Sequence, residues 1–402
     1  MPSKQRVTLS YCSLQILFWG MLGPFCGYQT SLMLARGFTA AQTGAFIALG
    51  FLAGILTQPL IGRWADRHPR FPLRMIVGGL MVPAIAVHAL LILLRPAFWG
   101  TAAIFFLLGV LETNAYPLID ALVMQFVNAG VEVPYSLGRG LGALAYACTC
   151  MLSGFLARRF GIESVLYVHG IFQILTAVCA CAFPAFPRDK LQKGQPQAAQ
   201  THSACAILRG NRTFAWMMLG GFFGMVAVMP LSSFLITIIE QRGGDTADLG
   251  VATFLMAASE LLSAAVFAAM RRRMRCDRIM LVSIVFMMVK PVLHLLAGSL
   301  TALILIQPVQ MLGYGLFSPA SVYFTNETVA PQDRVQGQSL KTTLTNSMGS
   351  LVGNLITGVI LSAGGPRAML LVGACSGLIG TVFALISVRF GSRAAQQRSS
   401  RA

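Results

Sequence analysis

The chain has 402 residues, of which 56% are hydrophobic and only 11% are charged. This composition excludes an ordinary soluble domain, in which about a quarter of the residues are charged. The formal net charge of +17 would suggest nucleic acid in a soluble protein, but here the basic residues lie between long apolar runs, so no nucleic-acid partner is expected.

Apolar runs long enough to cross a bilayer follow one another along the whole chain. One span needs about 20 predominantly apolar residues. The sequence therefore predicts an all-α membrane protein of about twelve transmembrane helices. The predicted spans are residues 8–34, 41–62, 72–94, 99–124, 136–157, 164–186, 214–239, 248–270, 278–298, 301–325, 336–362 and 367–388.

A polar stretch separates the sixth run from the seventh. Residues 187–213 contain the sequence K-G-Q-P-Q and several basic residues, which is typical of a cytoplasmic linker. We therefore predict an N-terminal six-helix half at 1–186 and a C-terminal six-helix half at 214–402. Two halves of six spans are the plan of transporters built from parallel repeats around a site near the middle of the membrane.

The distribution of basic residues predicts the orientation. Most of the 30 Lys and Arg residues lie in segments on the side of the N-terminus. The segments on the other side contain Arg36, Arg95, Arg158, Arg159, Arg242 and Arg367. By the positive-inside rule, both termini are expected in the cytoplasm of a multi-pass protein of the cell inner (plasma) membrane.

Five charged residues lie within predicted spans. They are Glu112, Asp120, Arg139, Glu260 and Lys290. A charge at this depth costs a few kcal/mol, about 2.5–3.5 on insertion scales, so each is a candidate functional residue. The alternative is a structural role, in which ion pairs fix the orientation of the helices. Asp120 and Arg139 flank a short loop, so an antiparallel hairpin would bring them together.

Residues 62–70, G-R-W-A-D-R-H-P-R, follow the second predicted span. They resemble the loop motif between helices 2 and 3 of the major facilitator superfamily, G-x-x-x-D-R/K-x-G-R/K, with Pro69 at its second glycine. The resemblance implies that Gly62, Asp66 and Arg67 act in gating. Gly62 would allow two helix ends to approach closely, and the charged pairs would break when the halves rock.

Two further segments resemble one branch of that superfamily, the lactose permease, oligosaccharide and nucleoside proton symporters. Residues 135–142, Y-S-L-G-R-G-L-G, are similar to the start of its helix 5, Y-G-R-x-R-x-x-G. Residues 259–264, S-E-L-L-S-A, are similar to G-E-L-L-N-A in helix 8 of lactose permease. The likeness extends over nearly the whole chain.

The resemblance implies roles for individual residues. Arg139 would donate to vicinal hydroxyls or a carboxylate, Asp120 would hold it, and Tyr146 would stack on a ring of the solute. Glu260 would bind the solute while protonated. The expected substrate-binding residues are Arg139, Asp120, Tyr146, Glu260 and Asn114, and the expected proton-coupling residues are Glu260, Glu112 and Lys290. Asn114 and Tyr116 are expected to supply polar partners to Glu112.

The chain also departs from lactose permease. Gln310 and Gly313 stand where helix 10 of that protein has a His and a Glu, and neither residue titrates usefully. Lactose is therefore not the expected solute, and proton coupling by the same route is not established. His88, His169 and His294 each lie alone in an apolar span, which is more typical of hydrogen-bonded core residues than of proton relays.

The predicted function is symport of a sugar, a nucleoside or an aromatic acid with protons by alternating access, in a monomer. The alternative is efflux of sugars or drugs by proton antiport, although the antiporter motif of helix 5, G-x-x-x-G-P-x-x-G-G, is absent at residues 138–143. No pattern indicates an enzyme, a cofactor or a metal site. The nine Cys residues are scattered through apolar stretches without a C-x-x-C pair and are expected to be small buried hydrophobes.

Overall fold

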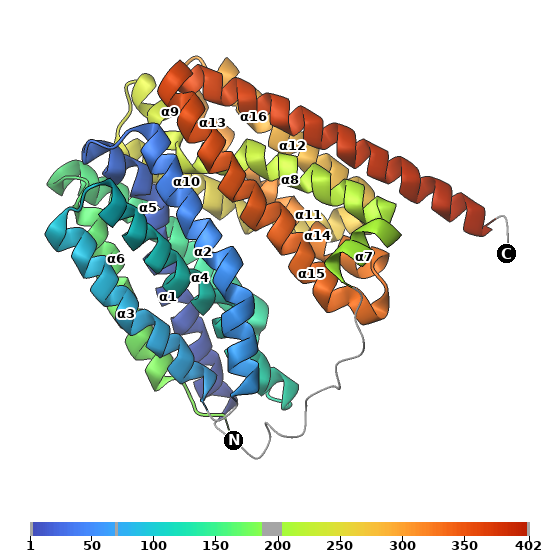
Figure 1. Cartoon of the computed structure of the whole chain (residues 1–402), viewed down its shortest axis with the longest axis horizontal. Coiled ribbons are helices and arrows are strands. Elements are labelled where there is room, and N and C mark those ends of the chain that lie inside the picture. The colour runs from blue at the N-terminus through green and yellow to red at the C-terminus, as the bar shows by residue number, and fades with distance from the viewer. Residues whose placement is uncertain (1–2, 69–70, 187–202, 400–402) are drawn as a thin grey trace. The chain divides into compact units, whose positions relative to one another are not determined.

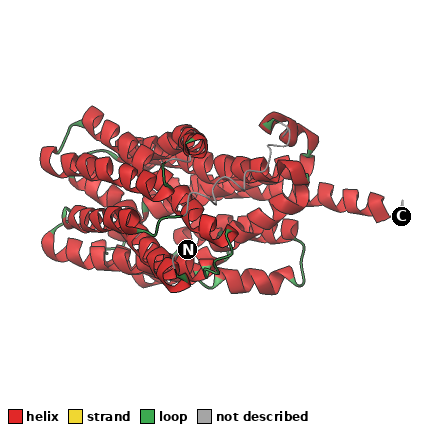
Figure 2. Cartoon of the chain, turned by 90° about the horizontal axis from the view of Figure 1, so that it is seen from below, coloured by secondary structure: helices red, strands yellow, loops and turns green. Residues whose placement is uncertain are grey.

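The computed structural model describes residues 3–68, 71–186 and 203–399, and the regular elements within these ranges are all helical (Figures 1 and 2). The chain divides into two compact units. The first unit comprises Met1–Pro196 with Gly244–Phe254, and the second comprises Gln197–Gly243 with Leu255–Ala402. The helix α10 begins in the first unit and ends in the second.

Six long helices build the first unit. They are α1 (Lys4–Ala35), α2 (Ala40–Arg67), α3 (Leu73–Leu94), α4 (Phe98–Asn128), α5 (Tyr135–Phe160) and α6 (Ser164–Ala182). The helix α1 packs on both α5 and α6, and α4 packs on α2 and α3. Apolar side chains from α1, α3, α4 and α6 form the core, with Tyr11, Phe18 and Phe126 at most 1% exposed.

Shorter and more interrupted elements build the second unit. They are α7 (Ala204–Gly210), α8 (Arg212–Ser233), α9 (Leu235–Gln241), α10 (Thr246–Glu260), α11 (Ser263–Arg271), α12 (Cys276–Leu296), α13 (Leu300–Ile306), the 3₁₀ segment η2 (Gln307–Met311), α14 (Tyr314–Thr328), the 3₁₀ segment η3 (Pro331–Asp333), α15 (Arg334–Thr342), the π segment η4 (Thr343–Ser347) and α16 (Met348–Ser399). Its core joins α8, α12, α14 and α16.

The number of spans agrees with the predicted fold class. Eleven helices among the described residues are long and apolar enough to cross a membrane. The last of them, Gln336–Gly391, has 56 residues and contains Gly365 at φ 69°, where the backbone is not helical. Because one span needs about 20 residues, this segment supplies two, which gives the predicted twelve.

Local sequence features account for the helix ends and for the close packing. Thr39 caps α2, since its hydroxyl accepts from the Gln42 amide while the Gln42 side chain accepts from the Thr39 amide. Gly109 in α4 lies against Gly50 in α2, where a Cβ would stand 2.6 Å from the Gly50 carbonyl oxygen. Small residues at such crossings allow helices to pack closely in lipid, where hydrophobicity cannot drive their association.

The structure differs from the predicted spans mainly in the second unit. The predicted span 248–270 is divided into α10 and α11 at Leu261 and Leu262, and the span 301–325 is divided by η2. Part of the predicted linker 187–213 lies outside the described residues, at 187–202. The remainder contains α7, which begins at Ala204 because the Ser203 hydroxyl caps it.

Candidate functional site

Asp120 and Arg139 lie on the two helices of one hairpin, as predicted. Asp120 is in α4, Arg139 is in α5, and residues 129–134 connect the two helices. Their side chains are close enough to interact electrostatically. Their charged atoms do not form a direct ion pair within 4 Å. Each of the two side chains instead contacts other described residues.

Two aromatic rings hold Arg139. The guanidinium carbon lies 5.0 Å from the ring centroid of Trp19 in α1 and 5.0 Å from that of Tyr116 in α4. Both distances are within the range of cation–π attraction. The Nη1 atom of Arg139 is buried and has no hydrogen-bond partner. The site therefore contains a positively charged donor that is oriented by apolar faces and retains capacity for a further acceptor.

A chain of hydrogen bonds holds Asp120. The side-chain amide of Gln15, which is 0% exposed, donates to Asp120 Oδ1 at 3.3 Å. The other end of the same amide accepts from Trp19 Nε1 at 2.9 Å. The Tyr135 hydroxyl also interacts with the carboxylate. Gln15 thus links Trp19, which packs on Arg139, to Asp120.

Tyr146 and Asn114 occupy different surroundings. The Tyr146 ring meets Trp19 edge to face, with centroids 6.4 Å apart, on the side of the aromatic cluster that faces α5. Asn114 is 1% exposed and donates to Thr57 Oγ1 at 2.7 Å and to the Val110 carbonyl at 2.6 Å. The bond to Thr57 joins α4 to α2, and the bond to Val110 lies within α4, so the predicted substrate role of Asn114 stays a prediction.

Glu112 has partners other than the predicted ones. Its Oε1 atom contacts His169 Nε2 at 3.1 Å and accepts from Gln173 Nε2 at 2.9 Å, both in α6. The expectation that Asn114 and Tyr116 would be its partners is wrong. Residues two apart on a helix point in nearly opposite directions, which removes Asn114, and Tyr116 packs on Arg139 instead.

The geometry of His169 determines how many protons this buried pair holds. His169 Nδ1 lies 2.9 Å from the Met21 carbonyl oxygen, which can only accept, so Nδ1 carries a hydrogen. At Nε2, either an imidazolium donates to the Glu112 carboxylate or a protonated Glu112 donates to a neutral imidazole. Both arrangements share one proton and have no net charge, which fits a pair in which Glu112 is 5% and His169 0% exposed.

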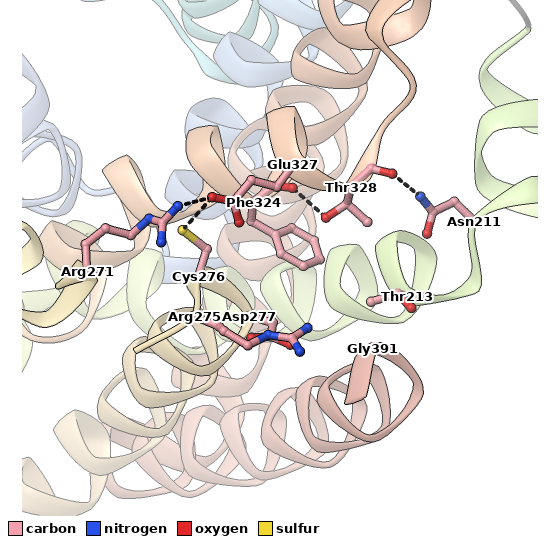
Figure 3. A pocket seen from close by; sticks show the side chains of 10 residues that line it. All are labelled: Asn211, Thr213, Arg271, Arg275, Cys276, Asp277, Phe324, Glu327, Thr328 and Gly391. Atoms are coloured by element: carbon pink, nitrogen blue, oxygen red, sulfur yellow. Dashed lines mark hydrogen bonds and ion pairs between the residues drawn. The ribbon is translucent and has the colours of Figure 1, made fainter. Parts of the chain in front are cut away.

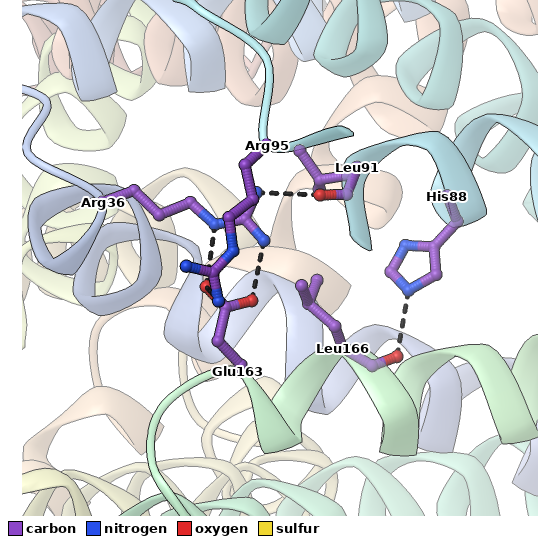
Figure 4. Close-up of polar contacts among 6 residues, drawn as sticks. All are labelled: Arg36, His88, Leu91, Arg95, Glu163 and Leu166. Carbon is purple, nitrogen blue, oxygen red and sulfur yellow. Dashed lines mark hydrogen bonds and ion pairs between the residues drawn. The ribbon is translucent and has the colours of Figure 1, made fainter. Parts of the chain in front are cut away.

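An ion-pair cluster joins the ends of three helices of the first unit (Figure 4). Arg36 contacts Glu163 with two nitrogens, Nε at 3.0 Å and Nη2 at 2.7 Å, while its Nη1 donates to the Leu91 carbonyl at 2.9 Å. Arg95 approaches the same carboxylate at 3.5 Å. The Arg36 side chain is only 7% exposed. A bidentate pair at this burial fixes the α1 end and the α5–α6 connection to α3.

Glu260 lies at a break in its helix. The helix α10 ends at Glu260, and the next helix, α11, begins at Ser263, whose hydroxyl donates to the Glu260 carbonyl at 2.6 Å. The Glu260 side chain is hydrogen-bonded to Gln310 and interacts electrostatically with Lys290. Non-helical backbone within a membrane is tolerated where it is buried in protein or lines a cavity.

Gln310 also binds Lys290, so it bridges the two charges. Lys290 in α12 is 2% exposed, and its Nζ donates to Gln310 Oε1 at 2.8 Å and to Met256 Sδ at 3.5 Å. Gln310 belongs to η2, where the tenth span loses its α-helical geometry. Among the described residues, no carboxylate lies within 4 Å of Lys290 Nζ. This buried ammonium is therefore held by neutral groups.

The three buried histidines are hydrogen-bonded, as predicted for core residues. His88 Nε2 lies 2.9 Å from the Leu166 carbonyl, and the His88 ring lies 4.3 Å from that of His169. His294 Nδ1 lies 2.8 Å from the Lys290 carbonyl, while its Nε2 faces Gln307 Nε2 at 3.0 Å. Because Gln307 donates there, His294 is a neutral tautomer protonated at Nδ1.

The predicted gating motif forms the end of α2 rather than a loop. The helix continues through Arg67, and the Trp64 ring stacks on His68 with centroids 4.9 Å apart. Among the described residues, a Cβ at Gly62 would meet no atom within 4 Å. The predicted close approach of two helix ends at this glycine stays a prediction. The side chain of Asp66 lies outside the described residues.

Sequence reasoning missed most of the neutral side chains of both sites. Gln15, Trp19, Tyr116 and Tyr135 surround Asp120 and Arg139, and Gln310 bridges Glu260 and Lys290. The available signal was positional for Gln15 and Trp19, which are four residues apart and therefore share one face of α1. Within the described ranges, no three His, Cys, Asp or Glu residues converge in a way that could hold a metal ion.

Comparisons with known proteins agree with this architecture. Residues 8–372 match the profile of the MFS_1 like family. A putative sugar efflux transporter from Deinococcus radiodurans is 24% identical over 368 residues, which cover 87% of this chain and 89% of the relative. Maltose permease from Geobacillus stearothermophilus is 22% identical over 222 residues, 55% of this chain and only about half (54%) of that relative's length. The crystal structure of the nucleoside transporter NupG superposes with a TM-score of 0.81 at 16% identity, covering 97% of this chain and 99% of that one.

Proposed function

Because the chain belongs to the MFS_1-like family of the major facilitator superfamily and is therefore a multi-pass membrane transporter, we propose that it carries a small polar solute inward together with protons. The proposed solutes are sugars, nucleosides and aromatic acids. The proposed location is the cell inner membrane, with both termini in the cytoplasm, and the proposed mechanism is alternating access by a monomer.

The observation that carries the proposal is the environment of Arg139. A guanidinium held against two adjoining rings, with Nη1 buried and unpartnered, is suited to a solute that supplies an acceptor beside a ring. Asp120 would accept from a hydroxyl of the same solute, and Tyr146 would stack on its ring. Sugars and nucleosides have both features, and the fold shared with a nucleoside transporter supports the second class.

Proton coupling is assigned to the second unit, at Glu260 and Lys290. Protonation of Glu260 would remove the negative charge that faces Lys290 through Gln310. The net charge of this buried region therefore differs between the two protonation states of Glu260. The solute would bind when Glu260 is protonated. Glu112 is proposed as a second proton-carrying group, since it shares one proton with His169.

The gating role proposed for Gly62, Asp66 and Arg67 rests on the resemblance to the superfamily motif. Residues 62–67 form the last turns of α2, where Arg67 is exposed. A helix end of this kind can form and break ion pairs at little cost, because its charges are partly solvated in either conformation.

The first experiment is thermal unfolding of the purified protein with a panel of sugars, nucleosides and aromatic acids. A solute that binds the folded state raises the midpoint by mass action, by about 2.7 kcal/mol of stability at 100 times the dissociation constant. We expect one class of solute to stabilise the parent protein clearly. The same solutes should stabilise the Arg139→Lys control only weakly and should not stabilise Arg139→Ala. Equal stabilisation of the parent and Arg139→Ala would contradict the proposed binding site.

Efflux is the second candidate function, because one relative matched over 87% of the chain is described as a putative sugar efflux transporter. The two directions are separated by proteoliposomes with an imposed pH gradient. Symport predicts accumulation of solute on the alkaline side, whereas antiport predicts accumulation on the acidic side.

A further inference from the structure

A cavity of 520 Å³ lies within the second unit, away from Glu260 and Lys290 (Figure 3). It is formed by the start of α8, the α11–α12 connection, the end of α14 and the last part of α16. Its lining consists of Asn211, Thr213, Arg271, Arg275, Cys276, Asp277, Phe324, Glu327, Thr328 and Gly391. Most of these side chains are polar, which distinguishes the cavity from an empty apolar void.

Two arginines of the lining are held by carboxylates. Arg271 pairs with Glu327, and Arg275 pairs with Asp277 at 3.0 Å. In each pair, the carboxylate contacts only the Nη2 atom of the arginine, although a guanidinium has five N–H donors. The Arg271 and Arg275 side chains are 40% and 50% exposed, respectively. Both arginines are oriented and still have donors for a second acceptor.

The surrounding charge is positive. The connection between α11 and α12 also contains Arg272 and Arg273, and Arg278 follows Asp277. The two carboxylates therefore balance only part of the arginine charge. Arginine is the residue best suited to planar, two-point recognition of phosphate groups, and basic pockets at the ends of membrane helices attract anionic head groups.

A glycine keeps the cavity open beside one arginine pair. A Cβ on Gly391 would stand 3.2 Å from Asp277 Oδ2, 3.4 Å from Arg275 Nη2 and 3.4 Å from Thr213 Cγ2. A larger side chain at this position would fill the space next to the guanidinium. The chain thus offers a way to block the cavity without removing any charge.

We propose that this cavity binds a phosphate group through Arg271 and Arg275. The group belongs either to an anionic lipid at the membrane surface or to a free phosphate. This site does not depend on the proposed solute or on proton coupling. Glu327 and Asp277 act as positioning residues that hold the two guanidinium groups apart and keep them oriented.

The test uses the full-length protein in a neutral detergent. Its thermal unfolding is followed in titrations with dioleoylphosphatidylglycerol, with dioleoylphosphatidylcholine, and with sodium phosphate against sodium chloride at equal ionic strength. Stabilisation by phosphatidylglycerol alone identifies a lipid head group, and stabilisation by inorganic phosphate identifies a free anion. If neither stabilises the parent, the proposal is overturned.

Three variants locate the effect. The double change Arg271→Gln/Arg275→Gln removes two charges from the lining, and Gly391→Leu fills the space beside Arg275 without removing any charge. We expect each to weaken the apparent affinity by at least about tenfold, the loss of one charge-assisted contact. The control Arg272→Gln/Arg273→Gln removes the same charge from the same connection, outside the lining. An equal loss in this control, or unchanged affinity in Gly391→Leu, would refute a site in the cavity.

Discussion

In the first unit Arg36 and Glu112 contact an oppositely charged or titratable side chain directly, whereas in the second unit the buried Lys290 contacts only neutral atoms. Arg36 donates three hydrogen bonds, two of them to Glu163, and Glu112 is hydrogen-bonded to two side chains of α6. Lys290 donates to an amide oxygen and a thioether sulfur. Lys290 thus lacks the direct ion-pair partner that Arg36 has, and in this respect it resembles Arg139 of the first unit, which is held by aromatic rings.

The backbone also differs between the two units, since the helices of the second unit are more often interrupted. The six long helices of the first unit are continuous, and the prolines within them do not divide them into separate elements. In the second unit, the chain leaves α-helical geometry at Leu261–Leu262 and again at Gln307–Gly313, next to Glu260 and Gln310. The interrupted segments of the second unit therefore contain or adjoin Glu260 and Gln310, the two residues that face Lys290.

The largest expected effect concerns the Arg36 cluster. Replacing Glu163 with Ala leaves a nearly buried guanidinium without its carboxylate, which costs about 3–5 kcal/mol in folding stability. Thermal unfolding should show a clearly lower midpoint. The matched control is Glu132→Ala, which removes an exposed pair with Lys4 and should leave the midpoint unchanged. Similar midpoints for the two variants would mean that burial does not make the Arg36 cluster stronger than a surface pair.

Glu260→Gln should separate binding from coupling in the second unit. Glutamine preserves the hydrogen-bonding shape but cannot release a proton, so accumulation driven by a pH gradient should fall about 100-fold. Exchange of labelled solute across the membrane without a gradient should continue, because it requires no net proton movement. If Glu260→Gln accumulates solute as well as the parent at every pH, coupling does not pass through this acid.

Lys290→Met tests whether the second unit gives up stability for function. Methionine has a similar volume and needs no partner, and no carboxylate of the described residues lies within 4 Å of Lys290 Nζ, so the change removes the cost of burying a charge that has no direct ion pair. We expect a higher unfolding midpoint together with loss of pH-driven accumulation. Arg36→Met is the counterpart in the first unit and should lower the midpoint. A lower midpoint in both variants would remove the proposed difference between the units.

The sequence predicted the membrane fold well, because a bilayer demands about 20 apolar residues for each span. It also indicated Asp120, Arg139 and Glu260 as candidate site residues, since a charge within an apolar run is easily recognised in a sequence. Trp19 and Tyr116 have no such mark, because an aromatic ring in an apolar helix is usually a core residue, and only the structure shows that Arg139 lies against both rings. Gln310 does not titrate, yet its amide has separate donor and acceptor ends that suit a bridge between two charges.

The helix interruptions had a weak signal that was overlooked. Pro308 stands at the start of η2 and Gly313 at its end, and both residues disfavour a continuous helix. The break at Leu261 and Leu262 has no local signal, because leucine is a good helix former. That break depends on tertiary contacts near Glu260, which a single sequence does not display.

Glu112→Gln should have the smallest effect of these substitutions on stability and on uptake. It tests whether the acid of the first unit takes part in proton coupling. Glutamine keeps an acceptor for His169 or Gln173, and the native pair has no net charge in either proton arrangement, so folding stability should change by less than about 1 kcal/mol. We expect uptake driven by a pH gradient to fall about threefold, far less than in Glu260→Gln, and His169→Gln to behave like Glu112→Gln. A loss as large as that of Glu260→Gln would mean that a fully partnered acid of the first unit also exchanges its proton in every cycle. Coupling would then depend on both units, and the interrupted helices of the second unit would no longer mark where it occurs.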